Sequence, residues 1–283
     1  MKQNKPTEAR GKLNHPDEVI AREELVIDNE WQVLKKYTQA RIGLGRAGIS
    51  QSTKDHLDFQ LAHAYAQDAV KTPLDWLKLE QSFVKFNIPI LTLHSKAKNR
   101  DSYLQRPDLG RRLDLESLEK LKAWQVDQDS PIDVCLVIAD GLSTKAIEMQ
   151  SGNMIKNTLQ NLEHAGFSCP LICFVKQARV AIGDEVAECL NAKMVVVMIG
   201  ERPGLSSPNS LGVYFTYQPR IGFSDAQRNC LSNIRAEGLS YNEACHRLIW
   251  LIKQASIKQL SGVKMKDESP SIEQIYTQKN NLN

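Results

Sequence analysis

Three apolar runs decide the fold: DVCLVIAD at 133–140, PLICFV at 170–175 and MVVVMIG at 194–200. Each is a near-continuous apolar stretch, which is typical of a parallel strand covered by helices on both faces. Between the first two runs, apolar residues at helical spacing predict a helix with Asn153 as its cap and Gly166 as its stop. This alternation predicts an α/β fold with a doubly wound, mostly parallel, Rossmann-like sheet.

The same patterns extend outward from these runs. Further strands are expected at 90–94 and 213–219. Helices are expected at 52–69, at 115–124, around 186–190 and from Thr72-Pro73 to about residue 86. Two S-x-x-E/Q boxes, beginning at Ser224 and Ser240, predict two capped helices, the last ending near Gly262.

These elements group into four segments. Residues 1–28 are polar and expected to be mobile, residues 29–87 form a helical N-terminal arm, residues 88–263 form the α/β domain, and residues 264–283 form a polar tail. A chain of 283 residues can bury a core of this kind without disulfides or metals.

Composition excludes several classes of protein. The 36 basic and 33 acidic residues leave a net charge of +3, too balanced for the concentrated basic face of a nucleic-acid binder. No apolar run approaches the ~20 residues that cross a bilayer. The first residues lack the apolar region of a secretory signal, so the chain is expected to be intracellular.

The six cysteines contain no C-x-x-C pair. Several lie inside apolar runs, so they are read as buried thiols, and neither disulfides nor a metal site are expected.

Gly43-Leu44-Gly45-Arg46-Ala47-Gly48 matches the dinucleotide fingerprint G-x-G-x-x-G. The fingerprint works only when a buried strand precedes it and a helix opens within it. Here the preceding residues are charged and helix-like, which favours a tight loop between helices over a nicotinamide or nucleotide site.

Three loops are expected at the carboxyl edge of the sheet, where ligands of doubly wound folds bind. They begin at Asp140, Lys176 and Glu201, each directly after an apolar run. Each loop alone is read first as an ordinary β–α turn, whereas the three together would equally suit a large ligand rich in amide groups and phosphate.

Arginines surround Pro107-Asp108 in RPDLGRRL. Arg106, Arg111 and Arg112 are either an anion or partner site or an internal Arg–Asp network, and the sequence leaves both open. No nucleophile, acid and base set is evident, and no serine lies in a G-x-S-x-G elbow, so no catalytic residue is assigned.

Several motifs in series resemble the small subunit of ethanolamine ammonia-lyase: YLQRPDLGRRL, VIADGLST, FVKQARVAIGDEVAECL, MIGERPGL and NCLSNIR. The resemblance runs from about Arg41 to Val263. It implies one subunit of a lyase that deaminates ethanolamine to acetaldehyde and ammonia with adenosylcobalamin. In that family, the large subunit holds the substrate, the small subunit closes over the cobalamin, and six copies of each assemble.

The resemblance also implies cofactor contacts at Val180, Glu201 and Cys230. Glu201 suits acceptance of amide N–H groups, whereas Val180 and Cys230 are expected to act through shape and backbone groups. Without the resemblance, Val180 reads as a strand-end core valine and Cys230 as a buried helix thiol.

Cobalamin enzymes that replace the lower base with histidine carry D-x-H-x-x-G, which is absent here, so a base-on cofactor is expected at the interface with the large subunit. Catalysis would belong mainly to the cofactor, and this chain alone should be inactive. The expected location is the cytoplasm. Family members are often packed into bacterial microcompartments through an N-terminal amphipathic helix, and no such stripe is evident at 1–28.

Overall fold

The computed structural model describes residues 26–126 and 131–272. The chain divides between His63 and Ala64 into two compact units. The first unit contains the 3-10 helix η1 (Glu30–Tyr37) and a two-stranded antiparallel sheet of β1 (Arg46–Ala47) and β2 (Ser50–Gln51). Helix α2 (Thr53–Lys71) begins in the first unit and ends in the second.

The second unit is built on a six-stranded sheet in the order β3-β5-β4-β6-β7-β8. The first four strands in that order are parallel to one another, and the β6–β7 and β7–β8 pairs are antiparallel. The strands are β3 (Ile90–His94), β4 (Val134–Ala139), β5 (Ile172–Lys176), β6 (Met194–Gly200), β7 (Leu211–Tyr217) and β8 (Asn229–Ile234). The predicted mostly parallel α/β sheet is therefore confirmed.

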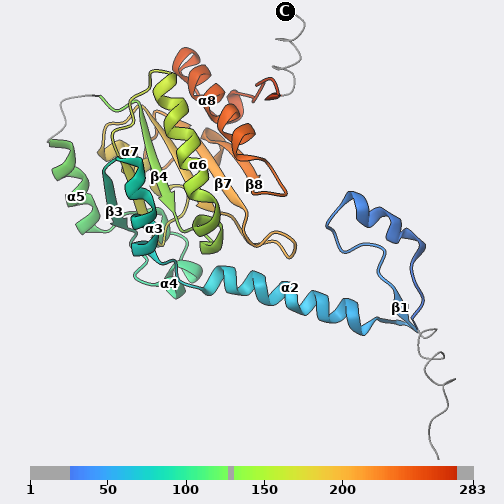
Figure 1. Ribbon diagram of the computed structural model, residues 1–283. Coiled ribbons are helices and arrows are strands. Elements are labelled where there is room, and N and C mark those ends of the chain that lie inside the picture. The colour runs from blue at the N-terminus through green and yellow to red at the C-terminus, as the bar shows by residue number, and fades with distance from the viewer. Residues whose placement is uncertain (1–25, 127–130, 273–283) are drawn as a thin grey trace, which may run out of the picture. The chain divides into compact units, whose positions relative to one another are not determined.

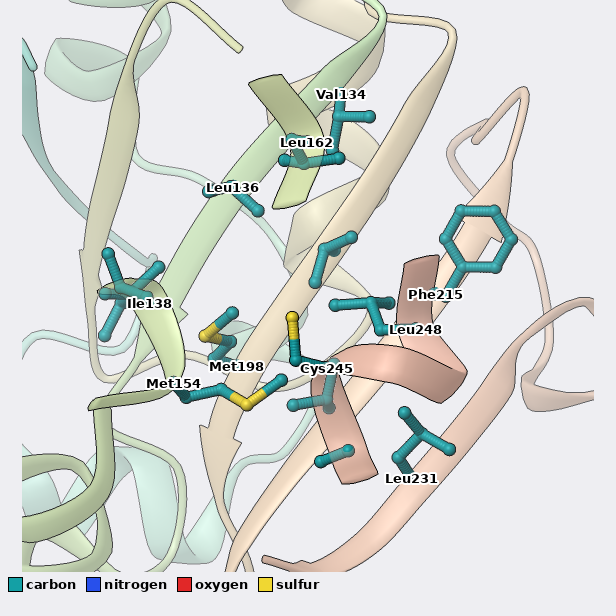
Figure 2. Close-up of a cluster of buried hydrophobic side chains, with 14 of the residues drawn as sticks. Val134, Leu136, Ile138, Met154, Leu162, Met198, Phe215, Leu231, Cys245 and Leu248 are labelled. Carbon is teal, nitrogen blue, oxygen red and sulfur yellow. The ribbon is translucent and has the colours of Figure 1, made fainter. Parts of the chain in front are cut away.

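Helices cover both faces of this sheet. One face carries α3 (Trp76–Phe83), α6 (Thr144–His164) and α8 (Tyr241–Lys258), which Figure 1 shows together, and the other carries α5 (Leu115–Val126) and α7 (Ile182–Cys189). Alternate side chains of β4 enter the two cores. Leu136 and Ile138 pack toward α6 and α8 (Figure 2), whereas Cys135 and Val137 pack toward α5 and α7. Burying each large aliphatic side chain stabilises the fold by about 1.5–3 kcal/mol, which explains the unbroken apolar runs.

Short elements complete the second unit. They are η2 (Val84–Phe86), α4 (Arg100–Gln105), η3 (Leu109–Arg111), η4 (Asp225–Gln227) and η5 (Gly262–Lys264).

Two predicted helix starts were wrong. Asn153 lies exposed inside α6, and the cap is Ser143, whose Oγ accepts the Ala146 N–H at 3.1 Å. The burial of Ala146 and Ile147 against the sheet extends the helix toward its N-terminus, outweighing the local signal at Asn153. Similarly, α3 is capped by Asp75 rather than starting at Thr72-Pro73.

The predicted helix after Ser224 was also wrong. Ser224 caps only the single turn η4, and the chain then forms the edge strand β8. Polar residues make up half of this strand (Asn229, Ser232 and Asn233), so it lacks the apolar run that revealed the others. Helix α8 begins after Ser240 as predicted but ends at Lys258, short of Gly262.

Helix α2 carries exposed apolar side chains. Leu57, Leu61 and Tyr65 are spaced along one side of α2, and each is more than half exposed. Across the described residues, no helix is both long and apolar enough to cross a membrane.

Candidate functional site

The carboxyl ends of the parallel strands form a hollow of about 430 Å³. Leu142 follows β4, Arg179 and Val180 follow β5, and Glu201 follows β6, so the three predicted loops do meet. Tyr103, Ile199, Gly200, Arg202, Tyr214 and Ser232 complete the lining.

A second hollow of about 620 Å³ adjoins the first. The two share Arg179, Val180 and Tyr214, so they form one continuous surface, which we call the carboxyl-edge hollow. The second part is lined by the arginine-rich loop around Pro107, by Glu185 on α7, and by residues 221–225.

Asp140 holds two of the loops together. Its carboxylate accepts the backbone N–H groups of Gln177 at 2.9 Å and Ala178 at 3.0 Å, and that of Gly141 at 3.0 Å. Gly141 has φ +61°, and a Cβ there would lie 2.3 Å from the carbonyl oxygen of Gly200. Burial raises the pKa of Asp140, and the N–H donors oppose this rise. Asp140 therefore shapes the site from beneath and does not face a ligand.

Glu201 joins the ends of three strands. Its carboxylate accepts the hydroxyls of Ser210 at 2.5 Å and Ser232 at 2.6 Å, and the Asn233 N–H at 3.2 Å. In the described part of the chain, no arginine forms an ion pair with it. A carboxylate has about four lone-pair positions, which leaves capacity for a further donor from the hollow.

Cys230 lies on edge strand β8 and is exposed, so its interpretation as a buried helix thiol was wrong. It lies opposite Tyr214 in the register of β7 and β8. Desolvation of the sulfur raises the pKa of the thiol, the Tyr214 hydroxyl lowers it, and Glu201 raises it further, with a net rise. Cys230 is therefore a neutral thiol at pH 7.

Val180 follows β5 and is partly exposed in both parts of the hollow. It shares this lining with Glu201, and Tyr214 connects both to Cys230, which itself lies just outside the lining. The structure thus brings the three sequence-predicted residues to one surface.

Arg106, Arg111 and Arg112 do not share one role: two belong to an internal network, and one faces the hollow. Arg106 binds Asp108 through two hydrogen bonds of 2.9 and 2.7 Å, and Arg112 binds Glu185 at 3.1 and 2.8 Å. These two form the internal network. Arg111 faces the hollow and has no carboxylate partner among the described residues.

Sequence reasoning missed Tyr103, Arg179 and Tyr214. Tyr103 is fully buried with the Arg179 guanidinium 4.2 Å from its ring centroid and that of Arg100 4.7 Å away. Its hydroxyl and the Nε of Arg179 are buried without a hydrogen-bond partner in the described structure. Only Tyr214 carried a signal, since alternation along 213–219 places it on the face opposite Phe215.

The glycine motif 43–48 lacks the geometry of a dinucleotide site. The 3-10 helix η1 precedes it, and β1 and β2 form a small hairpin across its end. Gly43 has φ +57°, and a Cβ there would lie 2.8 Å from the backbone of Trp31, so this glycine closes a tight loop.

Within residues 26–126 and 131–272, no group of three His, Cys, Asp or Glu side chains could hold a metal ion.

Comparisons with known proteins agree with one another. The family model for the ethanolamine ammonia-lyase light chain matches residues 28–266. The ethanolamine ammonia-lyase small subunit of Azotobacter vinelandii is 48% identical over 242 residues, covering 86% of this chain and 90% of the relative. That of Ralstonia nicotianae is 48% identical over 250 residues, covering 88% and 93%. That of Pseudomonas fluorescens strain SBW25 is 49% identical over 242 residues, covering 86% and 87%.

Proposed function

This chain belongs to the ethanolamine ammonia-lyase light chain family, and from that premise we propose that it is the small subunit of an adenosylcobalamin-dependent ethanolamine ammonia-lyase. It pairs with a large subunit, six copies of each, and covers one side of the cobalamin. The observation that carries this proposal is the gathering of Val180, Glu201 and Cys230 around Tyr214 at the carboxyl-edge hollow.

The lining of the hollow fits a corrin. Leu142, Val180 and Ile199 offer apolar contact, while the Tyr103 hydroxyl, buried without a hydrogen-bond partner among the described residues, offers a donor for an amide carbonyl. A buried donor without a partner costs about 1–3 kcal/mol, so an amide-rich ligand would relieve a cost that the chain bears alone. The hollow is open on one side, which leaves the other side of the cofactor to the large subunit.

Each residue has a separate task in this proposal. Glu201, fixed by Ser210, Ser232 and Asn233, accepts an amide N–H of the cofactor with little loss of side-chain freedom. Val180 packs on the ring, and Cys230 with Tyr214 sets the shape of the rim. None of the described histidines lines the hollow, so none of them would be placed to bind cobalt.

When bound, adenosylcobalamin would supply the radical chemistry of the reaction. The residues of this chain bind and orient the cofactor and exclude water from one side of it. The carboxylates at the hollow are engaged by donors of the chain, and none of the described ones is assigned an acid–base role. The proposed location is the cytoplasm, and packing into a microcompartment would depend on residues 1–25, which lie outside the described residues.

The test is reconstitution. The purified chain with adenosylcobalamin and ethanolamine should release no ammonia, and adding the large subunit of a close relative should restore turnover. Ammonia release by this chain alone, or a mixed complex that binds no cobalamin, would refute the proposal.

A further inference from the structure

We propose that Arg111 and Arg179 form a subsite for one phosphodiester, which we identify as that of the cofactor's nucleotide loop. This inference rests on the proposed function and extends it from the corrin to the nucleotide. It begins from the charges around the larger part of the carboxyl-edge hollow.

The carboxylates there all have arginine partners. Asp108 binds Arg106, Glu185 binds Arg112, and Arg228 lies between Asp184 and Asp225. Two guanidinium groups that line the same part, those of Arg111 and Arg179, have no carboxylate partner among the described residues. All three carboxylates of the lining, Asp108, Glu185 and Asp225, are thus already paired, which leaves the Arg111 and Arg179 guanidinium groups available for an added anion.

The two unpaired arginines differ in how they are held. Arg179 is anchored, because an Nη donates to the Tyr103 carbonyl at 3.0 Å and its guanidinium stacks on the Tyr103 ring. Its Nε is buried without a partner. Gly110 lies beneath it, since a Cβ there would come within 2.9 Å of the Arg179 Cγ. Arg111 is exposed at the end of η3 and reaches the hollow from the adjacent loop.

An anchored and an exposed guanidinium in one hollow suit an oxyanion, since each can donate paired N–H groups to its oxygens. The facing wall is apolar and aromatic, with Val180, Tyr214 and Phe223. This combination fits a nucleotide better than an inorganic ion. Of the parts of cobalamin, the corrin side chains are neutral amides, and the phosphodiester of the nucleotide loop is the anion.

The experiment compares two corrinoids in the complex of this chain with the large subunit. Adenosylcobalamin carries the phosphodiester and nucleotide, whereas adenosylcobinamide has the same corrin and adenosyl group without them. Binding is followed by visible absorbance for the wild type, Arg111→Ala and Arg179→Met. The control is Arg106→Ala, an exposed neighbour already paired with Asp108. Thermal melts check that each variant is folded.

Arg111→Ala and Arg179→Met should each raise the Kd for adenosylcobalamin about tenfold, equal to about 1.4 kcal/mol, and leave the Kd for adenosylcobinamide within twofold. Arg106→Ala should change neither. Raising the salt concentration should weaken adenosylcobalamin binding more in the wild type than in the variants. Equal loss for both corrinoids, or no loss for either, would overturn the subsite.

A further measurement, thermal melts with inorganic phosphate, distinguishes failure of the anion subsite from failure of the proposed function. If the wild-type complex binds neither corrinoid, the cobalamin proposal fails, and so does the assignment to its nucleotide loop. If inorganic phosphate then still raises the melting temperature of the wild type but not of Arg111→Ala, the anion subsite stands with a different ligand. If neither corrinoid binds and inorganic phosphate does not raise the melting temperature, the anion subsite is refuted.

Discussion

Two hollows of similar volume lie at opposite edges of the same sheet, and their linings differ. At the amino edge, residues 86–89, 167 and 169–170 border a hollow of about 400 Å³ together with Leu159, Leu162 and Glu163 of α6. At the carboxyl edge, the part next to Glu201 has about 430 Å³. The first exposes polar and apolar surface in nearly equal parts and has one charged side chain, Glu163, whereas the second is more apolar and also carries arginines and buried, unpaired donors.

This difference shows that size does not mark a binding site here. At the amino edge, the strands begin, and residues such as Pro89 and Pro170 only lead the chain into the sheet. At the carboxyl edge, three loops, α4 and the antiparallel strands converge, so polar groups from distant parts of the sequence meet. Substitutions at one edge of the sheet, compared with matched substitutions at the other, therefore test whether the cofactor binds at the carboxyl edge.

The largest expected effect is structural. Arg228 and Asp184 form a buried pair, with side chains 2% and 1% exposed, joined by hydrogen bonds of 2.6 and 2.7 Å. Arg228→Met should lower the free energy of unfolding by about 3–5 kcal/mol, because Asp184 stays buried without its cation. Denaturant unfolding measures this loss.

The free energy of unfolding of Arg228→Met should depend on pH. Burial already raises the pKa of Asp184, and Arg228 opposes the rise. Without Arg228 the folded state should hold a proton that the unfolded state releases, so the variant should regain stability as pH falls from 8 to 5. A loss that is the same at both pH values would contradict this reasoning. The wild type, with its cation in place, is the control.

Cys230→Trp should raise the Kd for adenosylcobalamin at least about a hundredfold, or roughly 2.7 kcal/mol, because the indole would fill the rim beside Tyr214. Cys169→Trp is the matched control, since Cys169 borders the amino-edge hollow. It should leave the Kd within twofold, provided that a thermal melt shows the variant folded. If Cys230→Trp and Cys169→Trp raised the Kd equally, cofactor binding could not be assigned to the carboxyl edge.

Glu201→Gln should raise the Kd about tenfold, near 1.4 kcal/mol, through the loss of a charge-assisted acceptor. Ser210 and Ser232 can reorient their hydroxyls toward the amide, so the melting temperature of the cofactor-free complex should fall only slightly. An unchanged Kd with a clear fall in melting temperature would assign Glu201 to the joining of β7 and β8 alone.

Cys230→Ser should have the smallest effect, less than about threefold on cofactor binding, because a neutral thiol contributes mainly shape. Since the thiol pKa is raised, iodoacetamide should modify Cys230 more slowly at pH 8 than it modifies an unperturbed thiol of pKa ≈ 8.5. Peptide mass mapping gives this rate. Fast modification at pH 8, or complete inactivation by serine, would indicate a reactive thiolate.

The parallel strands could be predicted because two-sided burial leaves apolar runs such as 194–200. The same runs located the three loops, and hence Val180 and Glu201 on one edge. Strand β8 could not be predicted, because an edge strand alternates weakly and Cys230 on it resembled a helix residue. The roles of Tyr103 and Arg179 depend on contacts between residues 76 positions apart, which no local pattern reveals.

The most direct test of cofactor binding at the carboxyl edge is hydrogen exchange in the complex with the large subunit, measured with and without adenosylcobalamin. Because the large subunit is present in both samples, only the cofactor changes protection. Protection should increase at 178–181, 201–202 and 230–233, and it should not change at 86–89 and 167–170. Increased protection at the amino edge alone, or at neither edge despite bound cofactor, would contradict the assignment.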